Sequence, residues 1–228
     1  MDDFFVVYGL TIISIIITLA AQFYVNSSYK KYKKITNSKG INGCNAAKEI
    51  LHKSGLSDVK VEEVRGNLTD HYDPRDKTVR LSTDIYHGTS IASVSVAAHE
   101  CGHAIQDSEG YFFMRVRASL VPVVNFSSYA GYLAIVFGFM FGALNLVWIG
   151  ILCEIAILGF QLVTLPVELN ASKRALKKVK EYGLLEEGKE LKRGRTMLFA
   201  AAMTYVASVA TTLIQILRLI LMVGRRND

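Results

Sequence analysis

Four long apolar runs constrain the fold of this chain more than any other feature. Residues 4–25 carry no charged side chain, and a run of this length can cross the hydrocarbon core of a bilayer. Residues 120–141 and 144–165 form two further runs joined by a short Gly-Ala turn, which predicts a transmembrane hairpin. Residues 196–217 form a fourth, more polar run, which either spans the membrane or packs against the rest of the protein. Because 228 residues could hardly enclose all four runs in a soluble core, we expect an integral membrane protein.

Basic residues gather beside these runs. The chain has 26 Lys and Arg against 20 Asp and Glu, and no nucleic-acid-binding motif accompanies its net charge of +6. The basic clusters instead follow the positive-inside rule for cytoplasmic loops, where they also attract anionic lipid headgroups. We expect a multi-pass protein of the cell membrane, with no nucleic-acid partner and with residues 26–119 and 166–195 on the cytoplasmic side. If the fourth run spans the membrane, Arg225 and Arg226 end outside, against this rule.

The segment 90–107 has the pattern of a helix and contains His99-Glu100-Cys101-Gly102-His103. Residues four apart lie on one helical face, so both imidazoles can reach one metal ion, for which tetrahedral zinc is the expected choice. Glu100 follows the first histidine and can take a proton from a metal-bound water. The surrounding helix is small and apolar, where buried histidines need a partner such as a metal. The motif therefore predicts a zinc-dependent hydrolase, most simply a peptidase.

A catalytic zinc usually has three protein ligands, and the third is less obvious. An extended motif would place a histidine at position 109, which is Glu109 in this chain. Glu109, Asp107 and Asp70 are possible ligands without a supporting pattern.

Glu168 is the best candidate for the third ligand. Pro166 is expected to break or kink the third apolar run, so that a new helix begins at the membrane surface. The alternative is that Glu168 only stabilises the first turn of that helix through the helix dipole. Glu168 shares one helical face with small residues that would allow a close approach to the motif helix: Ala171, Ser172 and Ala175.

The remaining segments predict a small α+β portion. Residues 42–53 have the pattern of an amphipathic helix, residues 59–64 that of a strand, and residues 68–72 and 78–82 that of a hairpin. One strand edge could hold an extended substrate, or the hairpin is purely structural. The predicted fold is mainly α and membrane-integral, with three or four transmembrane helices and a zincin-like portion made of the motif helix and a short antiparallel sheet.

Three segments resemble the YugP-like bacterial membrane zinc metallopeptidases, a family distantly similar to the HtpX-type integral-membrane proteases. The resemblance implies that His99, His103 and Glu168 bind one zinc ion and that Glu100 is the general base. At Ser172 the chain departs from the HtpX pattern, in which an Asp commonly orients a ligating histidine. The resembling segments are Leu68-Thr-Asp-His-Tyr-Asp-Pro-Arg75, Val96-Ala-Ala-His-Glu-Cys-Gly-His-Ala-Ile-Gln106 and Leu165-Pro-Val-Glu-Leu-Asn-Ala-Ser-Lys-Arg-Ala-Leu176.

Peptide hydrolysis also needs a hydrogen-bond donor for the oxyanion, beside the metal. His71 is the first candidate, followed by Tyr72 and Arg174; alternatively, His71 is a turn residue satisfied by local hydrogen bonds. Glu154 lies within the third apolar run, where a charge is costly and often functional. Arg218 could be its partner, or Arg218 reaches the outer surface and Glu154 is protonated.

These observations predict five parts along the chain and one leading function. The function is that of a membrane-bound zinc endopeptidase, acting at the cytoplasmic face on protein or peptide substrates such as misfolded proteins. The alternatives are a non-proteolytic membrane scaffold with a structural zinc, and a transporter or channel built around Glu154. The sequence indicates neither the substrate nor the oligomeric state. The expected parts are an anchor (1–28), a catalytic portion (29–116), a transmembrane hairpin (117–166), a helix with the third ligand (167–195) and a C-terminal apolar helix (196–228).

Overall fold

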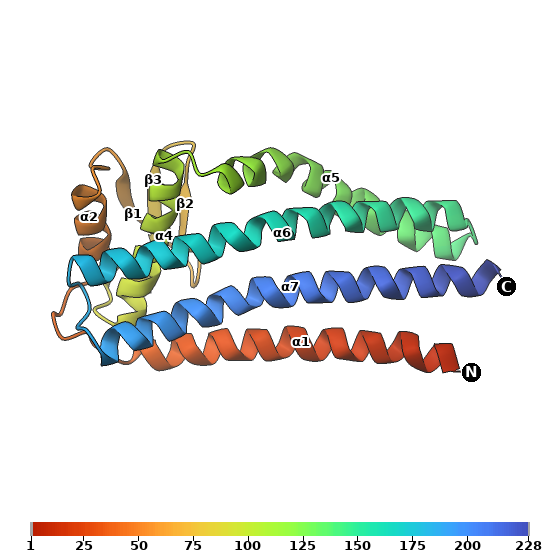
Figure 1. The fold of residues 1–228 in the computed structure, drawn as a ribbon, viewed down its shortest axis with the longest axis horizontal. Coiled ribbons are helices and arrows are strands. Elements are labelled where there is room, and N and C mark those ends of the chain that lie inside the picture. Colours follow the sequence, from red (N-terminus) through yellow and green to blue (C-terminus); the bar gives the residue numbers. More distant parts are fainter. Residues whose placement is uncertain (1, 228) are drawn as a thin grey trace. The chain divides into compact units, whose positions relative to one another are not determined.

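The computed structural model describes the backbone of residues 2–227 and the side chains of residues 5–224. Helices dominate these residues, and three short strands form a single sheet (Figure 1). The prediction of a mainly α fold with a small α+β portion is thus confirmed. The elements are α1 (Asp2–Lys33), α2 (Gly43–Lys53), β1 (Lys60–Val64), β2 (His71–Asp73), β3 (Thr78–Ser82), α3 (Thr83–His87), α4 (Ile91–Ser108), α5 (Phe112–Met140), α6 (Leu144–Glu181) and α7 (Lys189–Asn227).

The chain divides into two compact units. The first, which we call the membrane unit, comprises Met1–Gln22, Phe112–Pro166 and Thr204–Asp228. The second, which we call the α+β unit, comprises Phe23–Tyr111 and Val167–Met203. Three of the long helices, α1, α6 and α7, therefore contribute residues to both units.

The membrane unit consists of helical segments that run lengthwise beside one another (Figure 1). Within the described part of the chain, α1, α5, α6 and α7 are each long and apolar enough to cross a membrane. Many of their large apolar side chains are exposed, among them Phe126, Tyr132 and Leu152. In water such a surface would be unfavourable, whereas lipid chains would cover it.

Small residues bring α5 and α6 together, as is usual for helices that pack in a membrane. A Cβ on Gly131 would lie 2.6 Å from Cβ of Cys153, and one on Gly138 would lie 2.6 Å from Cγ2 of Val147. The two helices are joined by residues 141–143, close to the turn that the sequence predicts. The hairpin therefore has no room for larger side chains at these two glycines.

One sequence-based expectation about the long helices is wrong, and one of the two alternatives for Arg218 is not observed. The new helical start after Pro166 does not occur, because α6 continues without interruption from Leu144 to Glu181. A proline removes one backbone donor, and the hydrogen bonds of the flanking turns hold the helix together. The suggested pair of Glu154 and Arg218 is also absent from the described residues. Arg218 instead donates from Nη1 to Oγ1 of Thr11, at 2.8 Å.

The sheet of the α+β unit has the order β1-β3-β2. β2 and β3 pair in the antiparallel manner of the predicted hairpin, whereas β1 pairs with β3 in parallel, with Lys60 opposite Thr78. The expected purely antiparallel sheet is therefore corrected to a mixed one. β3 lies between the other two strands, and its apolar residues Val79 and Leu81 are fully buried.

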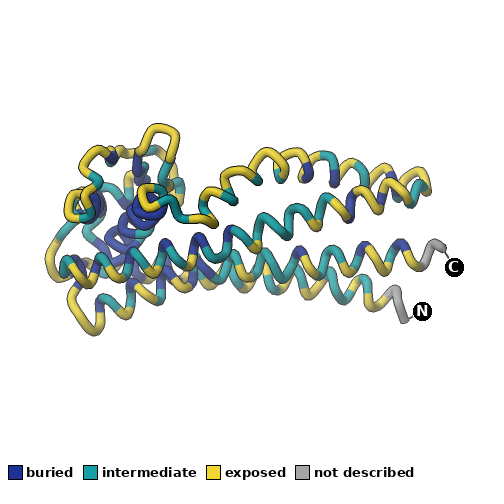
Figure 2. The backbone as a smooth tube through the Cα atoms, turned by 45° about the horizontal axis from the view of Figure 1, so that its top comes forward, coloured by how far each residue is buried: buried dark blue, intermediate teal, exposed yellow. Residues whose placement is uncertain are grey.

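Helix α4, which carries the histidine motif, is the most buried helix among the described residues of the α+β unit (Figure 2). Its first turn is capped by Ser90, whose Oγ accepts a hydrogen bond from the backbone N–H of Ser93 at 3.0 Å. Its apolar side packs into the core formed with α2 and the sheet, where Ile50, Leu81 and Ala97 are buried together. The core thus fixes the helix along most of its length.

Candidate metal centre

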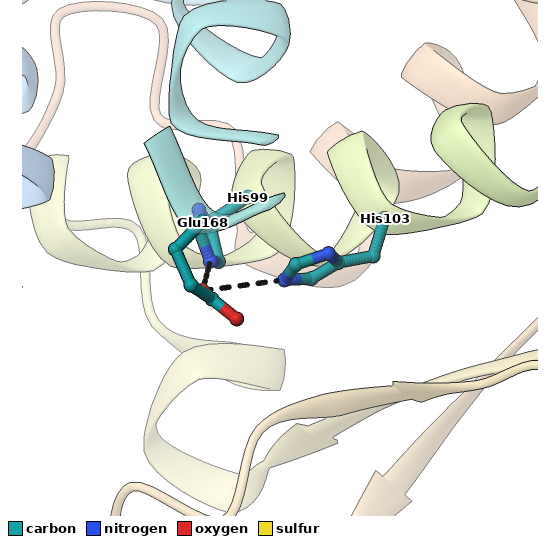
Figure 3. Close-up of side chains that lie close together, drawn as sticks. All are labelled: His99, His103 and Glu168. Carbon is teal, nitrogen blue, oxygen red and sulfur yellow. Dashed lines mark hydrogen bonds and ion pairs between the residues drawn. The ribbon is translucent and has the colours of Figure 1, made fainter. Parts of the chain in front are cut away.

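His99 and His103 project from α4 toward Glu168 of α6 (Figure 3). Nε2 of His99 lies 3.2 Å from Oε2 of Glu168, and Nε2 of His103 lies 3.6 Å from the same oxygen. Ligand atoms bound tetrahedrally at about 2.0 Å from zinc are about 3.3 Å apart, so these separations fit one such ion. All three side chains are largely buried, and their donor set of two imidazoles and one carboxylate is that of a catalytic zinc site with an open fourth position.

Each histidine is held by a second partner at its other ring nitrogen. Nδ1 of His99 lies 3.2 Å from Oγ of Ser172, and Nδ1 of His103 lies 3.0 Å from Oε1 of Gln106. When Nδ1–H donates to these oxygens, the lone pair of each Nε2 is left for a metal. Ser172 occupies the position of the Asp in the HtpX pattern. Its hydroxyl can orient His99 through a hydrogen bond between uncharged groups.

Gln106 ties the motif helix to α6. Its Nε2 donates to the carbonyl oxygen of Val167 at 2.8 Å and to Oδ1 of Asn170 at 3.0 Å. This fixes the orientation of the amide, so that Oε1 faces His103 as an acceptor. Gln106 was not singled out from the sequence, although its position three residues after His103 places it on the same helical face.

Glu100 is buried beside the cluster, with 7% of its surface exposed. Burial raises the pKa of this carboxyl group, against the lowering effect of His99 and His103. Within the described part of the chain it makes no hydrogen bond or ion pair. A buried carboxylate without a partner is unusual, and a base that faces a water molecule would be such a group.

The carboxylates also act on His103. Burial by itself lowers the pKa of this imidazole, but the hydrogen bond with Glu168 and the charges of Glu100 and Glu168 raise it above its ordinary value. Without a metal, the raised pKa favours the protonated form of His103, and a metal ion would have to displace this proton.

Helices α4 and α6 approach each other closely at Gly102, inside the motif. A Cβ on this residue would lie 2.6 Å from the carbonyl oxygen of Ala171, one helical turn from Glu168. Real side chains essentially never approach a backbone oxygen that closely. The small face of α6, with Ala171 and Ala175 buried, completes the contact.

We expect the substitution Gly102→Ala to lower the stability of the protein and its zinc content together. The added methyl group must push α6 away, which costs about 1–3 kcal/mol by overpacking and moves Glu168 from the histidines. Thermal unfolding in detergent and metal analysis would measure both effects. Gly159→Ala is the matched control, because a Cβ there meets nothing within 4 Å. An unchanged unfolding midpoint for Gly102→Ala would contradict the close approach.

A second expected result concerns Ser172→Ala. Loss of the hydroxyl leaves Nδ1 of His99 without its partner, and such changes around a metal site typically weaken binding by about 10–100-fold. Competition with a zinc-binding dye would measure the affinity. Ser108→Ala is a suitable control, since among the described residues Oγ of Ser108 bonds only the carbonyl oxygen of Ile105 in its own helix. Equal zinc affinities of the wild type and Ser172→Ala would show that Ser172 does not orient the ligand.

The other acidic residues considered as ligands have different partners. Glu109 forms an ion pair with Arg174 at 2.7 Å, which lowers the pKa of its carboxyl group. Asp107 accepts a hydrogen bond from the hydroxyl of Tyr72 at 2.9 Å. Asp70 accepts hydrogen bonds from the backbone N–H and the hydroxyl of Ser82, although burial raises its pKa. None of the three belongs to the cluster around His99.

The three suggested oxyanion donors lie in different settings. His71 is exposed at the start of β2, and its Nδ1 lies 2.7 Å from the carbonyl oxygen of Thr69. Burial and the hydrogen bond that the hydroxyl of Tyr72 donates to Asp107 raise the pKa of Tyr72. Arg174 is held by Glu109 and also donates from Nε to Oδ1 of Asn170, at 2.6 Å. His71 thus has the local hydrogen bond expected of a turn residue.

Comparison with known proteins identifies the family of the chain. The chain is 44% identical over 219 residues to a Bacillus subtilis (strain 168) protein named "Putative membrane protease YugP", covering 96% of this chain and 97% of that protein. No solved structure matches the chain. Residues 7–224, which include the complete histidine and glutamate cluster, match a family described as "Putative neutral zinc metallopeptidase". The chain therefore belongs to this family.

Proposed function

We propose that the chain is a membrane-bound, zinc-dependent endopeptidase with one zinc ion per chain. The observation that carries this proposal is the buried, unpartnered carboxylate of Glu100 next to His99, His103 and Glu168. The sequence similarity supports the same reading, because the relative is named as a membrane protease. The basic clusters next to the apolar runs favour a site on the cytoplasmic side, where misfolded or membrane-proximal proteins are the proposed substrates.

The proposed roles follow from the contacts of each residue. His99, His103 and Glu168 would hold the ion, while Ser172 and Gln106 keep the imidazoles oriented. A zinc ion held there would lower the pKa of a bound water towards about 7 and polarise the scissile carbonyl. Glu100 would take the proton of that water and deliver it to the leaving amine.

His71 is the proposed donor to the oxyanion, with a restriction that its hydrogen bond imposes. Because Nδ1 lies against the carbonyl oxygen of Thr69, the ring proton of neutral His71 belongs on Nδ1. Only the protonated imidazolium could then also donate from Nε2. Replacement of His71 would separate this role from a purely structural one, since only the former would reduce the rate of cleavage.

A membrane scaffold with a structural zinc is the second candidate. Structural zinc sites usually have four protein ligands, whereas the described cluster offers three. A buried general base also has no use in such a site. The alternative of a channel or transporter rests on the amphipathic hairpin and on Glu154, which has no ionic partner among the described residues.

Removal of the metal tests the proposed function. We expect the detergent-purified, zinc-loaded protein to cleave an unstructured protein such as casein, to stop cleaving it after treatment with 1,10-phenanthroline, and to recover with one equivalent of zinc. Circular dichroism of the chelated protein controls for unfolding. Cleavage that persists after the metal has been removed, as verified by metal analysis, would exclude a zinc peptidase. Lack of cleavage by the zinc-loaded protein would favour the scaffold.

A further inference from the structure

A groove of about 750 Å³ lies between the parts of α6 and α7 that belong to the α+β unit. Its floor is apolar, and two of its residues, Leu169 and Phe199, are 44% and 52% exposed. No acidic residue lines it. The apolar side chains of the groove are Leu169, Leu176, Leu191, Leu198, Phe199 and Ala202.

Five basic side chains surround this floor: Lys173, Lys177, Lys180, Lys192 and Arg195. Only Lys180 has an ionic partner within the part of the chain that the structure describes, namely Glu187 at 3.4 Å. Some other basic residues of the α+β unit are paired with carboxylates, as Arg174 is with Glu109 and Lys53 with Glu49. The groove thus combines an apolar floor with a positive charge that the protein does not neutralise.

The position of the groove in the sequence indicates what could occupy it. Its residues on α6 begin four residues after the apolar run 144–165, and its residues on α7 extend into the run 196–217. In a helix that spans a membrane, residues directly beyond the apolar run lie at the level of the lipid headgroups. An occupant with an anionic head and apolar chains is therefore available where the groove opens.

We propose that this groove binds an anionic phospholipid of the surrounding bilayer. Its phosphate contacts the unpaired lysines, and its acyl chains cover Leu169, Leu176 and Phe199. An inorganic anion would leave the apolar floor uncovered, and a neutral lipid would leave the charges uncompensated. The groove also contains Ser172, whose hydroxyl bonds His99, so the lipid lies next to the metal centre.

The test measures binding to the full-length protein, purified in a non-ionic detergent and loaded with zinc. Fluorescent dioleoyl phosphatidylglycerol is titrated, with unlabelled phosphatidylglycerol, phosphatidylcholine, inorganic phosphate and an acidic amphipathic peptide as competitors. The combined variant Lys173→Gln, Lys177→Gln and Lys192→Gln removes charge from the groove. The matched control, Lys30→Gln, Lys34→Gln and Lys39→Gln, removes three exposed charges that do not line it. Phe199→Ser tests the apolar floor.

We expect saturable binding that phosphatidylglycerol displaces and phosphatidylcholine or phosphate does not. The groove variant should bind about tenfold or more weakly, since each basic residue near an anionic lipid contributes to its attraction, while the control stays close to the wild type. Phe199→Ser should also bind more weakly. Unfolding midpoints verify that each variant is folded.

Several results would overturn the proposal. Equal losses in the two lysine variants would show a general attraction of the anionic lipid to basic residues. Displacement by phosphate, or an unaffected Phe199→Ser, would indicate a site for small anions, and displacement by phosphatidylcholine a site for apolar chains. Displacement by an acidic amphipathic peptide would assign the groove to a protein segment. Because proteolysis is not measured, failure of the proposed peptidase activity would not change any of these outcomes.

Discussion

The substitution Glu100→Gln is expected to abolish casein cleavage while the protein keeps its zinc. Glutamine has nearly the same size and fills the same buried position, but its amide cannot take a proton from water. General acid–base catalysis contributes on the order of 10²–10⁴-fold to such reactions, so the rate of cleavage should fall by that factor. Zinc should stay bound, because its proposed ligands are His99, His103 and Glu168.

The control for this experiment is Glu49→Gln, which makes the same chemical change in α2. Glu49 forms an ion pair with Lys53 at 2.7 Å on the surface, and such pairs contribute little to stability. Cleavage rate, zinc content and unfolding midpoint should be measured for all three proteins. A folded Glu100→Gln protein that retains zinc and cleaves casein at the wild-type rate would exclude Glu100 as the base. A wild type and variant that both bind zinc and both leave casein intact would favour the scaffold.

The elements that the sequence predicts well are those with a strong local signal. The length and apolarity of residues 4–25 predict a helix that spans a membrane, and this run lies within α1. The histidine motif is equally local, since the spacing of His99 and His103 defines a helical face before any tertiary contact forms. The helix that contains it, α4, matches the expected range closely.

The features that the sequence does not predict depend on contacts between distant segments. The alternation of residues in β1 indicates a strand, but not that it joins β3 in parallel, with β2 on the other side. Likewise, Pro166 suggests a helix boundary, whereas α6 continues through it, held by the hydrogen bonds of the flanking turns. For β1 the sequence indicates the strand but not its partner, and at Pro166 the local preference for a boundary does not end the helix.

The metal centre lies between these extremes. The sequence indicates Glu168 because small residues share its helical face. These residues allow the close approach of Gly102 to Ala171 in the structure. Ser172 could be located but not assigned a partner. Gln106 was overlooked, because a glutamine on a helix is ordinary until Val167 and Asn170 are known to be within its reach.

Replacing Glu168 with glutamine tests the remaining ligand, and we expect loss of zinc rather than loss of fold. The amide keeps the shape of the side chain but removes the negative charge that lies 3.2 Å from His99 and 3.6 Å from His103. A metal held by two neutral imidazoles and an amide loses its only anionic ligand. The decrease in zinc affinity should therefore exceed the roughly 10–100-fold typical of residues that only orient ligands, such as Ser172.

Glu181→Gln at the end of the same helix is the matched control. Glu181 is exposed and pairs with Lys178 at 3.2 Å, away from the histidines. Zinc affinity measured by dye competition should fall in the order wild type and Glu181→Gln, then Ser172→Ala, then Glu168→Gln, and casein cleavage should follow the same order at limiting zinc. If Glu168→Gln instead binds zinc as tightly as the wild type, the third ligand is another residue. Glu109 would then be the first to examine. Its side chain is exposed, so its ion pair with Arg174 can break more easily than the hydrogen bonds between Asp70 and Ser82.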